Sequence, residues 1–288
     1  MQAIRSILVV LEPDQEESLA LKRARLIAGC TGSELHLLVC DGQHDRGEFL
    51  GELTEGLETE GFKVSTRQEW QDASHEIIIA AQQAEGCGLV VKQHYPDNPL
   101  KKALLTPDDW KLLRYCPCPV LLVKTDRPWG GGKVLAAVDV GNDDPEHQTL
   151  HAAIVCHAHE VAHLARGELH VLSAHPAPML SAADPTFQLR ETIAARYRDA
   201  CQRFQDEYGL SNHQLHIAEG PADLLIPQLA LQLDAVVTVL GTVARTGLSG
   251  ALIGNTAEVV LDVLESDVLV LKPDDICDHL EKLLEEQP

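Results

Sequence analysis

The sequence predicts an α/β protein with two tandem domains, each an open parallel five-stranded sheet with helices on both faces. Short apolar runs alternate with longer amphipathic stretches, which is the pattern of repeated βα units. The strand-like runs are apolar throughout, as expected for parallel strands that helices cover on both sides. Several segments also recur in the same order in the two halves of the 288 residues. These observations predict two similar domains and not one large one.

The repeat is visible in three pairs of segments. Each pair contains an apolar strand-like run, and the first pair ends in an acidic residue in both copies. The matching segments are Ser6–Glu12 with Lys133–Asp139, Gly32–Val39 with Arg166–Ser173, and Pro119–Asp126 with Asp267–Asp274. We therefore expect domains at 1–126 and 133–274, joined by the proline- and glycine-rich stretch 126–132. Residues 275–288 are expected to form a helical tail, either packed on the protein or docking a partner.

In the second copy the elements can be placed individually. Apolar residues at steps of three and four predict the helices, and continuous apolar runs predict the strands. Strands are expected at 134–139, 168–174, 214–218, 235–240 and 268–271, and helices at 150–164, 193–208 and 224–233.

Composition excludes several classes of partner. Lys and Arg total 23 against 44 Asp and Glu, so the formal net charge is −21, and aromatic residues make up 4%. Nucleic-acid binding depends on basic residues that neutralise phosphates, and anionic lipid repels an acidic surface, so neither partner is expected. No apolar run approaches the roughly 18 residues of a membrane span. The N-terminus lacks the features of a signal peptide. The 8 cysteines are irregularly spaced, and their closest pair, Cys116-Pro-Cys118, is not a CxxC motif, so we expect a reduced, cytoplasmic protein.

A glycine-rich loop follows the fourth strand of the second copy. Gly241, Gly247 and Gly254 allow the backbone to approach a ligand closely, and Arg245 adds a cation. Asn255 is then a candidate N-cap, with Glu258 three residues later, so free N–H groups at this helix start could bind phosphate. The alternative is a glycine-rich connection that leads into a capped helix and binds no ligand.

The order of these residues carries a resemblance. Asp139 after the first strand, followed by Gly241-x2-Ala244-x9-Gly254-Asn255, resembles the universal stress protein family, whose fold is of the adenine nucleotide alpha hydrolase type. The tandem arrangement is similar to that of double-domain bacterial members. The resemblance covers nearly the whole chain and implies a stress-response role through binding and signalling rather than turnover.

The resemblance also implies ATP or a related adenine nucleotide as the ligand of the second domain. It places Asp139 and the backbone of Ala174 at adenine, with Gly241, Ala244 and Gly254 as the three motif glycines. The other positions implied at the site are Arg245, Gly247, Asn255 and Thr256. The chain departs from the family pattern at Ala244, which adds a methyl group, and at Asn255, where the family has Ser or Thr.

The first copy is expected to lack this site. Its equivalent stretch, 92–110, contains no glycine, and Thr106 and Pro107 predict a well-capped helix start. Asp108 and Asp109 place carboxylates where a phosphate would lie, and Glu12 replaces the strand-end aspartate. The basic residues of this region could line another anionic site or could be solvated loop charges; they are Lys92, His94, Lys101 and Lys102.

Other chemistry has weaker support. Cys156, His159 and His163 share one helical face and are candidate zinc ligands. No further ligand outside this helix can be named, and a solvated helix face is the alternative. No nucleophile or Walker A motif is present, so slow ATP hydrolysis is the most turnover expected. The alternative functions are binding of a non-nucleotide small molecule, an amphiphile among them, or of a metal by a stress regulator. An internal pseudo-dimer of the two domains is expected, and a homodimer remains open.

Overall fold

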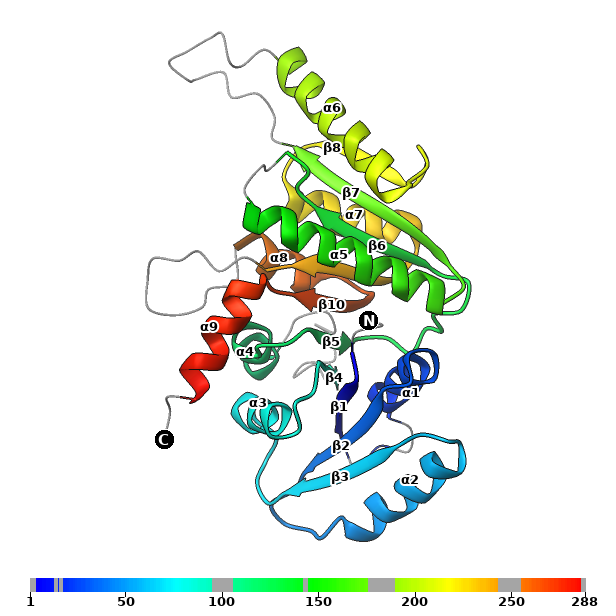
Figure 1. Ribbon diagram of the computed structural model, residues 1–288, viewed down its shortest axis with the longest axis vertical. Coiled ribbons are helices and arrows are strands. Elements are labelled where there is room, and N and C mark those ends of the chain that lie inside the picture. The colour runs from blue at the N-terminus through cyan, green and yellow to red at the C-terminus, as the bar shows by residue number, and fades with distance from the viewer. Residues whose placement is uncertain are drawn as a thin grey trace.

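The structure, a computed structural model, describes residues 4–12, 15, 18–94, 106–141, 145–175, 190–242 and 255–285. Within these ranges ten strands form one sheet, in the order β3-β2-β1-β4-β5-β10-β9-β6-β7-β8 (Figure 1). The first half contains β1 (Ser6–Leu11), α1 (Leu19–Thr31), β2 (Glu34–Cys40), α2 (Gly47–Thr59), β3 (Val64–Glu69), α3 (His75–Ala84), β4 (Leu89–Gln93), α4 (Pro107–Tyr115) and β5 (Val120–Val123). The second half contains β6 (Lys133–Val138), α5 (Pro145–Leu164), β7 (Glu168–His175), α6 (Arg190–Tyr208), β8 (Leu215–Glu219), α7 (Ala222–Leu233), β9 (Ala235–Gly241), α8 (Asn255–Val263), β10 (Asp267–Leu271) and α9 (Asp274–Glu285).

Each half is an all-parallel sheet with the same strand order. The order is β3-β2-β1-β4-β5 in the first half and β8-β7-β6-β9-β10 in the second. This confirms the predicted α/β class and parallel pairing, and the second-copy strands begin and end within one residue of their predicted bounds. The helices extend further than predicted at their N-terminal ends, since α5 begins at Pro145 and α6 at Arg190. Among the described residues, no helix is both long and apolar enough to cross a membrane.

The two halves join through their fifth strands. β10 pairs antiparallel with β5, with Leu269 opposite Leu121, and every residue of β5 is fully buried. The sequence did not predict this pairing, which makes one continuous sheet from two. Because β5 and β10 run in opposite directions, the carboxyl ends of the two sets of parallel strands lie at opposite edges of the sheet.

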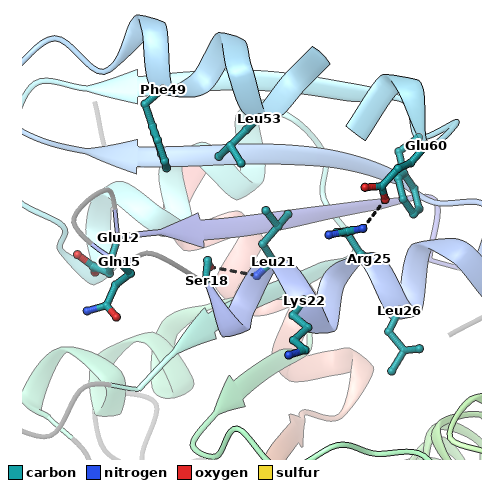
Figure 2. A pocket seen from close by; sticks show the side chains of 11 residues that line it. Glu12, Gln15, Ser18, Leu21, Lys22, Arg25, Leu26, Phe49, Leu53 and Glu60 are labelled. Atoms are coloured by element: carbon teal, nitrogen blue, oxygen red, sulfur yellow. Dashed lines mark hydrogen bonds and ion pairs between the residues drawn. The ribbon is translucent and has the colours of Figure 1, made fainter. Parts of the chain in front are cut away.

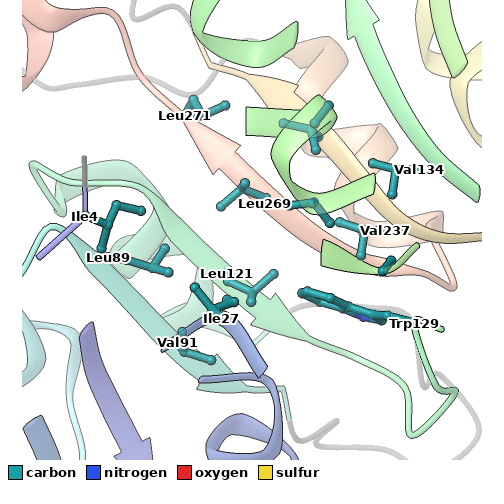
Figure 3. Close-up of a cluster of buried hydrophobic side chains, with 14 of the residues drawn as sticks. Ile4, Ile27, Leu89, Val91, Leu121, Trp129, Val134, Val237, Leu269 and Leu271 are labelled. Atoms are coloured by element: carbon teal, nitrogen blue, oxygen red, sulfur yellow. The ribbon is translucent and has the colours of Figure 1, made fainter. Parts of the chain in front are cut away.

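The hydrophobic core is shared by both halves on each face of the sheet. Side chains alternate along a strand, so Leu121 and Leu269 face one side while Leu122 and Val268 face the other. Figure 3 shows the first of these cores, where side chains of β4 and β5 meet those of β9 and β10. Each buried aliphatic side chain contributes about 1.5–3 kcal/mol, so the junction is part of the fold and not a loose interdomain contact.

A buried charged network fixes the linker between the halves. The Asp267 carboxylate, at the start of β10, is fully buried and is paired with the Arg23 guanidinium of α1 at 2.8 Å. Its Oδ2 also accepts a hydrogen bond from Trp129 Nε1 at 2.8 Å. Its Oδ1 accepts hydrogen bonds from the amides of Lys124 at 2.9 Å and Thr125 at 3.1 Å. Arg23 lies over the Trp129 ring, so one residue of each half and the linker share this site.

The C-terminal helix α9 packs against the protein. Ile276 is 8% exposed and Leu280 is 3% exposed, which supports the packed-tail interpretation of this segment. Glu281 of the same helix lies near the end of α3, because it lines a pocket together with Gln82 and Gly86.

Candidate functional site

The carboxyl ends of the central strands of the second half lie side by side. β6 runs between β7 and β9, so Asp139, Ala174 and Gly241 lie at one edge of the sheet, near the ends of these three strands. Ligands of open parallel sheets bind at this edge. Four predicted residues, Ala244, Arg245, Gly247 and Gly254, lie outside the described residues. Helix α8 begins at Asn255, so the predicted helix start that includes Asn255 and Thr256 is present in the backbone.

Asp139 presents an exposed carboxylate in a turn held by buried groups. Its Oδ1 accepts a hydrogen bond from the Gly141 amide at 3.2 Å. Two buried side chains fix the backbone of the turn. The Asp139 amide donates a hydrogen bond to His151 Nε2 at 3.2 Å, and the Val140 amide donates one to Ser173 Oγ at 3.3 Å. Burial lowers the pKa of His151 to about 4, so the ring is neutral at pH 7 and can accept this hydrogen bond.

An aromatic pair lies against the same turn. The rings of His175 and Tyr197 are 5.0 Å apart, and Tyr197 Oη is 3.5 Å from Asp139 Oδ1. Tyr197 also covers Gly141 so closely that a Cβ there would lie 2.2 Å from its Cζ atom. The pattern of apolar residues did not predict this aromatic wall, because it depends on how α6 docks against β7.

Gly241 has a packing role as well as its place at the strand end. A Cβ at this position would lie 2.6 Å from Leu150 Cδ2 and 2.9 Å from Ile154 Cδ1, both on α5. The following Thr242 is buried and its amide donates to the Leu271 carbonyl at 2.8 Å, which continues the β9–β10 pairing. The side of Gly241 that lacks a side chain therefore faces a helix of the core.

Beside this turn is a small pocket of about 260 Å³ between α5 and α6. Val140 and His151 line it from the Asp139 side, and Arg203 supplies a cation. Phe204 and Tyr208 of α6 close it, with their rings 4.6 Å apart.

In the first half, the helix start that corresponds to the start of α8 is the start of α4, and a carboxylate of the protein itself lies there. Thr106 caps α4, and Asp109 completes a capping box with it, which confirms the predicted helix start. The Asp109 carboxylate is fully buried and lies 2.8 Å from Lys92 Nζ and 2.7 Å from His94 Nδ1. Burial raises its pKa, but the hydrogen bond from His94 and the charge of Lys92 outweigh that effect and lower it to about 2.

This arrangement settles the assignment of two of the basic candidates. Lys92 and His94 bind Asp109 and therefore do not form a separate solvated cluster. Asp108 is half-exposed and lies 3.3 Å from His75, while Lys101 and Lys102 lie outside the described residues. A carboxylate paired with Lys92 and in contact with His94 therefore lies at this helix N-terminus, the kind of position that attracts anions.

A larger pocket lies in the first half, between α1 and α2 (Figure 2). Its volume is about 580 Å³, and in Figure 2 Phe49 and Leu53 of α2 point toward α1. Its wall is apolar, its rim is charged, and its residues include Glu12, Leu21, Lys22, Arg25, Leu26, Phe49, Leu53, Glu60 and Phe62. The sequence did not predict this pocket, because the facing residues of α1 and α2 lie in separate periodic patterns.

The zinc candidates lie on the outer face of α5. Cys156, His159 and His163 are all exposed. In the described part of the chain, no group of three or more His, Cys, Asp or Glu side chains is arranged to hold a metal ion. His157, on the apolar side of the same helix, is half-buried, with its Nδ1 2.9 Å from the Ala153 carbonyl.

Comparison with known proteins agrees with the repeat. The model of the Universal stress protein family matches residues 3–124 and again residues 132–272. The chain belongs to the universal stress protein family. The tandem organisation inferred from the sequence is that of a universal stress protein with two family domains in one chain.

Several members of the family share this tandem length. Universal stress protein E of Escherichia coli (strain K12) is 31% identical, over 95% of this chain and 96% of that protein. The Universal stress protein E homolog of Haemophilus influenzae is 29% identical, over 93% of this chain and 97% of that protein. The resemblance to double-domain bacterial members is therefore confirmed.

Solved structures of similar proteins share the fold. A functionally unknown protein from Pseudomonas aeruginosa PAO1 is 68% identical, with a TM-score of 0.92 and 99% of each chain covered. A universal stress protein from Archaeoglobus fulgidus DSM 4304 is 17% identical with a TM-score of 0.64, covering 94% of this chain and 99% of that one, and so shares the fold alone.

Proposed function

We propose that this universal stress protein acts in the cytoplasm in stress survival and binds ATP or a related adenine nucleotide in its second domain, 133–274. The observation that carries the proposal is the position of Asp139. Its carboxylate is exposed at the carboxyl end of β6, beside the ends of β7 and β9. The backbone amides of this turn donate hydrogen bonds to His151 and Ser173. A rigid acceptor at this edge suits the exocyclic amine of an adenine base.

The family pattern assigns the remaining contacts of the proposed site. Asp139 accepts from adenine, and the backbone of Ala174 at the end of β7 meets the base. The loop after β9 and the start of α8 receive the phosphates through backbone N–H groups. The residues proposed there are Gly241, Ala244, Arg245, Gly247, Gly254, Asn255 and Thr256.

We propose one nucleotide site per chain. In the first half, the Asp109 carboxylate lies at the start of α4, where it is paired with Lys92 Nζ and contacts His94 Nδ1. A phosphate brought to this helix would meet a buried negative charge, so binding there would require the expulsion of Asp109. One site for two repeated domains is the expected stoichiometry.

Calorimetric titration of ATP into the purified full chain tests the proposal, with Asp139→Asn as the variant. Loss of a hydrogen bond to an ionised acceptor should weaken binding by about 10- to 100-fold. Glu12→Gln is the matched control, because Glu12 follows β1 as Asp139 follows β6. The control should leave the titration unchanged. A wild-type protein with no binding heat and no co-purified nucleotide would refute the proposal.

Hydrolysis is a separate question. The Nε2 atom of His151 already accepts a hydrogen bond from the Asp139 amide, so this imidazole is not poised as a general base for water. We therefore expect binding without rapid turnover. Phosphate release that is lost in Asp139→Asn would instead support a slow ATPase, whereas release that persists would indicate a contaminant.

The pocket of the first half supports a second candidate function, binding of a non-nucleotide amphiphile. Its volume of about 580 Å³ lies in the range of small-molecule sites, about 300–1,000 Å³. Phe49, Leu53 and Phe62 suit an acyl or other apolar chain, and Lys22, which also lines the pocket, suits an anionic head group.

Organic extraction of the purified protein followed by mass spectrometry tests this candidate. Leu53→Trp should fill the pocket and abolish any co-purified amphiphile, while Leu231→Trp, at a 73% exposed position of α7, should not. An extract with no apolar compound, together with no uptake of added fatty acid, would remove the candidate.

A further inference from the structure

Two cysteines lie in contact where the first half meets the second. Cys116 ends α4 and Cys118 leads into β5, with Pro117 between them. Their Sγ atoms are in contact at 3.6 Å, and a disulfide requires them to approach to about 2.05 Å. Cys116 is fully buried and Cys118 is 9% exposed.

A buried lysine lies beside this pair. Lys272, which follows β10, is 8% exposed, and its Nζ donates to the Cys116 carbonyl at 2.7 Å. The hydrogen bond from Cys118 and the charge of Lys272 lower the pKa of Cys116, although burial opposes them. The pKa of Cys118 is raised by its hydrogen bond to Cys116 and by burial. The two Sγ atoms are close enough to share one proton, and either sulfur can be its donor.

A pocket leads to the pair. It has a volume of about 630 Å³ and is lined by Cys118, Gln82 and Glu281 among other residues. Gln82 Oε1 is buried and has no hydrogen-bond partner within the described ranges, while its Nε2 donates to the Cys87 carbonyl at 2.7 Å. A small polar molecule that donates a hydrogen bond, such as hydrogen peroxide, would satisfy this oxygen.

We propose that Cys116 and Cys118 are a peroxide-oxidised dithiol, which forms an intrachain disulfide while Lys272 stabilises the Cys116 thiolate. Cys118 Sγ, on the pocket side, attacks one oxygen of hydrogen peroxide as its proton passes to Cys116. The O–O bond breaks, hydroxide leaves, and Cys118 becomes a sulfenic acid. Cys116 returns its proton to that hydroxide, which gives water.

The second step closes the disulfide. The Cys116 thiolate attacks Cys118 Sγ, the S–S bond forms, and the S–O bond breaks. The hydroxide that leaves takes a proton from solvent, so one peroxide and one solvent proton give two waters as the thiolate–thiol pair loses two electrons. A small thiol of the cytoplasm can reverse the reaction, since a disulfide within three residues is strained and readily reduced.

The neighbouring cysteines are poor competitors. Burial raises the pKa of Cys87 to about 12 and that of Cys277 to about 11, so both remain thiols at neutral pH. A thiolate is the reactive form, and Cys118 differs from these neighbours in having the Cys116 sulfur at 3.6 Å to accept its proton.

Oxidation of the full chain by hydrogen peroxide, followed by maleimide alkylation and tryptic mass spectrometry, tests the proposal. Cleavage after Arg114 and Lys124 releases peptide 115–124, which contains both cysteines. In the native protein this peptide should lose two hydrogens and accept no maleimide. Formation of the disulfide should be severalfold faster than in the same chain unfolded in urea, because the folded chain holds the two Sγ atoms 3.6 Å apart.

Variants separate the roles of the groups. Lys272→Met should slow disulfide formation severalfold, whereas Cys201→Ser, a buried cysteine on α6, should leave the rate unchanged. Equal rates in native and unfolded chains would overturn the proposal. So would a peptide 115–124 that keeps two maleimides while the exposed Cys30 is oxidised, or a disulfide between Cys118 and Cys87. If Lys272→Met does not fold, the comparison of native with unfolded wild type decides.

Discussion

Replacement of Asp267 by asparagine tests whether the buried network holds the two halves and the linker together. The carboxylate accepts two hydrogen bonds on each oxygen, and Arg23 is 3% exposed beside it. Asparagine can keep the oxygen that receives the amides of Lys124 and Thr125. Its NH2 group would then face Arg23 Nε and Trp129 Nε1, which are both donors.

The expected loss follows from these contacts. Two hydrogen bonds to an ionised acceptor disappear, at about 1.5–3 kcal/mol each. Removal of one partner from a buried ion pair costs about 3–5 kcal/mol, because the other charge stays buried and unpaired. Both routes predict a decrease of roughly 3–5 kcal/mol in the free energy of unfolding.

Guanidinium unfolding followed by tryptophan fluorescence and by circular dichroism measures this loss, and Trp129 reports directly from the network. Asp234→Asn is the matched control, since Asp234 pairs with Arg127 of the same linker but its side chain is 82% exposed. A surface pair contributes about 0–1 kcal/mol. If Asp267→Asn costs no more than this control, the network does not hold the linker and the reasoning fails.

Three further outcomes are expected. Gly241→Ala should destabilise the protein by about 1–3 kcal/mol through its contact with Leu150, whereas Gly51→Ala, on an open helix position, should stabilise it slightly; thermal unfolding compares them. Burial lowers the pKa of His151 from 6.5 in the unfolded chain to about 4 in the folded protein, so the free energy of unfolding should fall by up to about 3 kcal/mol as pH drops from 6.5 to 4. His151→Asn should flatten this pH dependence in denaturant titrations. Asp109 has a folded pKa of about 2 against 3.8, so its contribution of about 2 kcal/mol should persist above pH 3.8 and disappear toward pH 2, and Asp109→Asn should remove that acid-dependent part.

Local patterns predicted most of the elements. The second-copy strands were placed within a residue because fully buried parallel strands are continuous apolar runs. The start of α4 was predicted because Thr106, Pro107 and Asp109 satisfy its amides through short-range contacts.

Contacts between distant segments could not be predicted in this way. β5 is apolar throughout and β10 is apolar after Asp267, so their apolar pattern does not specify that they pair or in which direction. Lys272 is 156 residues from Cys116, and their contact depends on that pairing. At the candidate nucleotide site, the place of Gly241 was predicted from its loop motif, but its contact with Leu150 was not, because it arises from the docking of α5.

The antiparallel junction also bears on what each half could be alone. Separation would leave Val120–Val123 or Asp267–Leu271 with unpaired backbone groups on a strand whose side chains are all buried in the intact chain. Such a strand is a template for pairing with any other chain, and a truncated half would self-associate or aggregate. Fusion of the two repeats therefore protects each of them from uncontrolled assembly at every protein concentration, since the partner strand is always supplied by the same molecule.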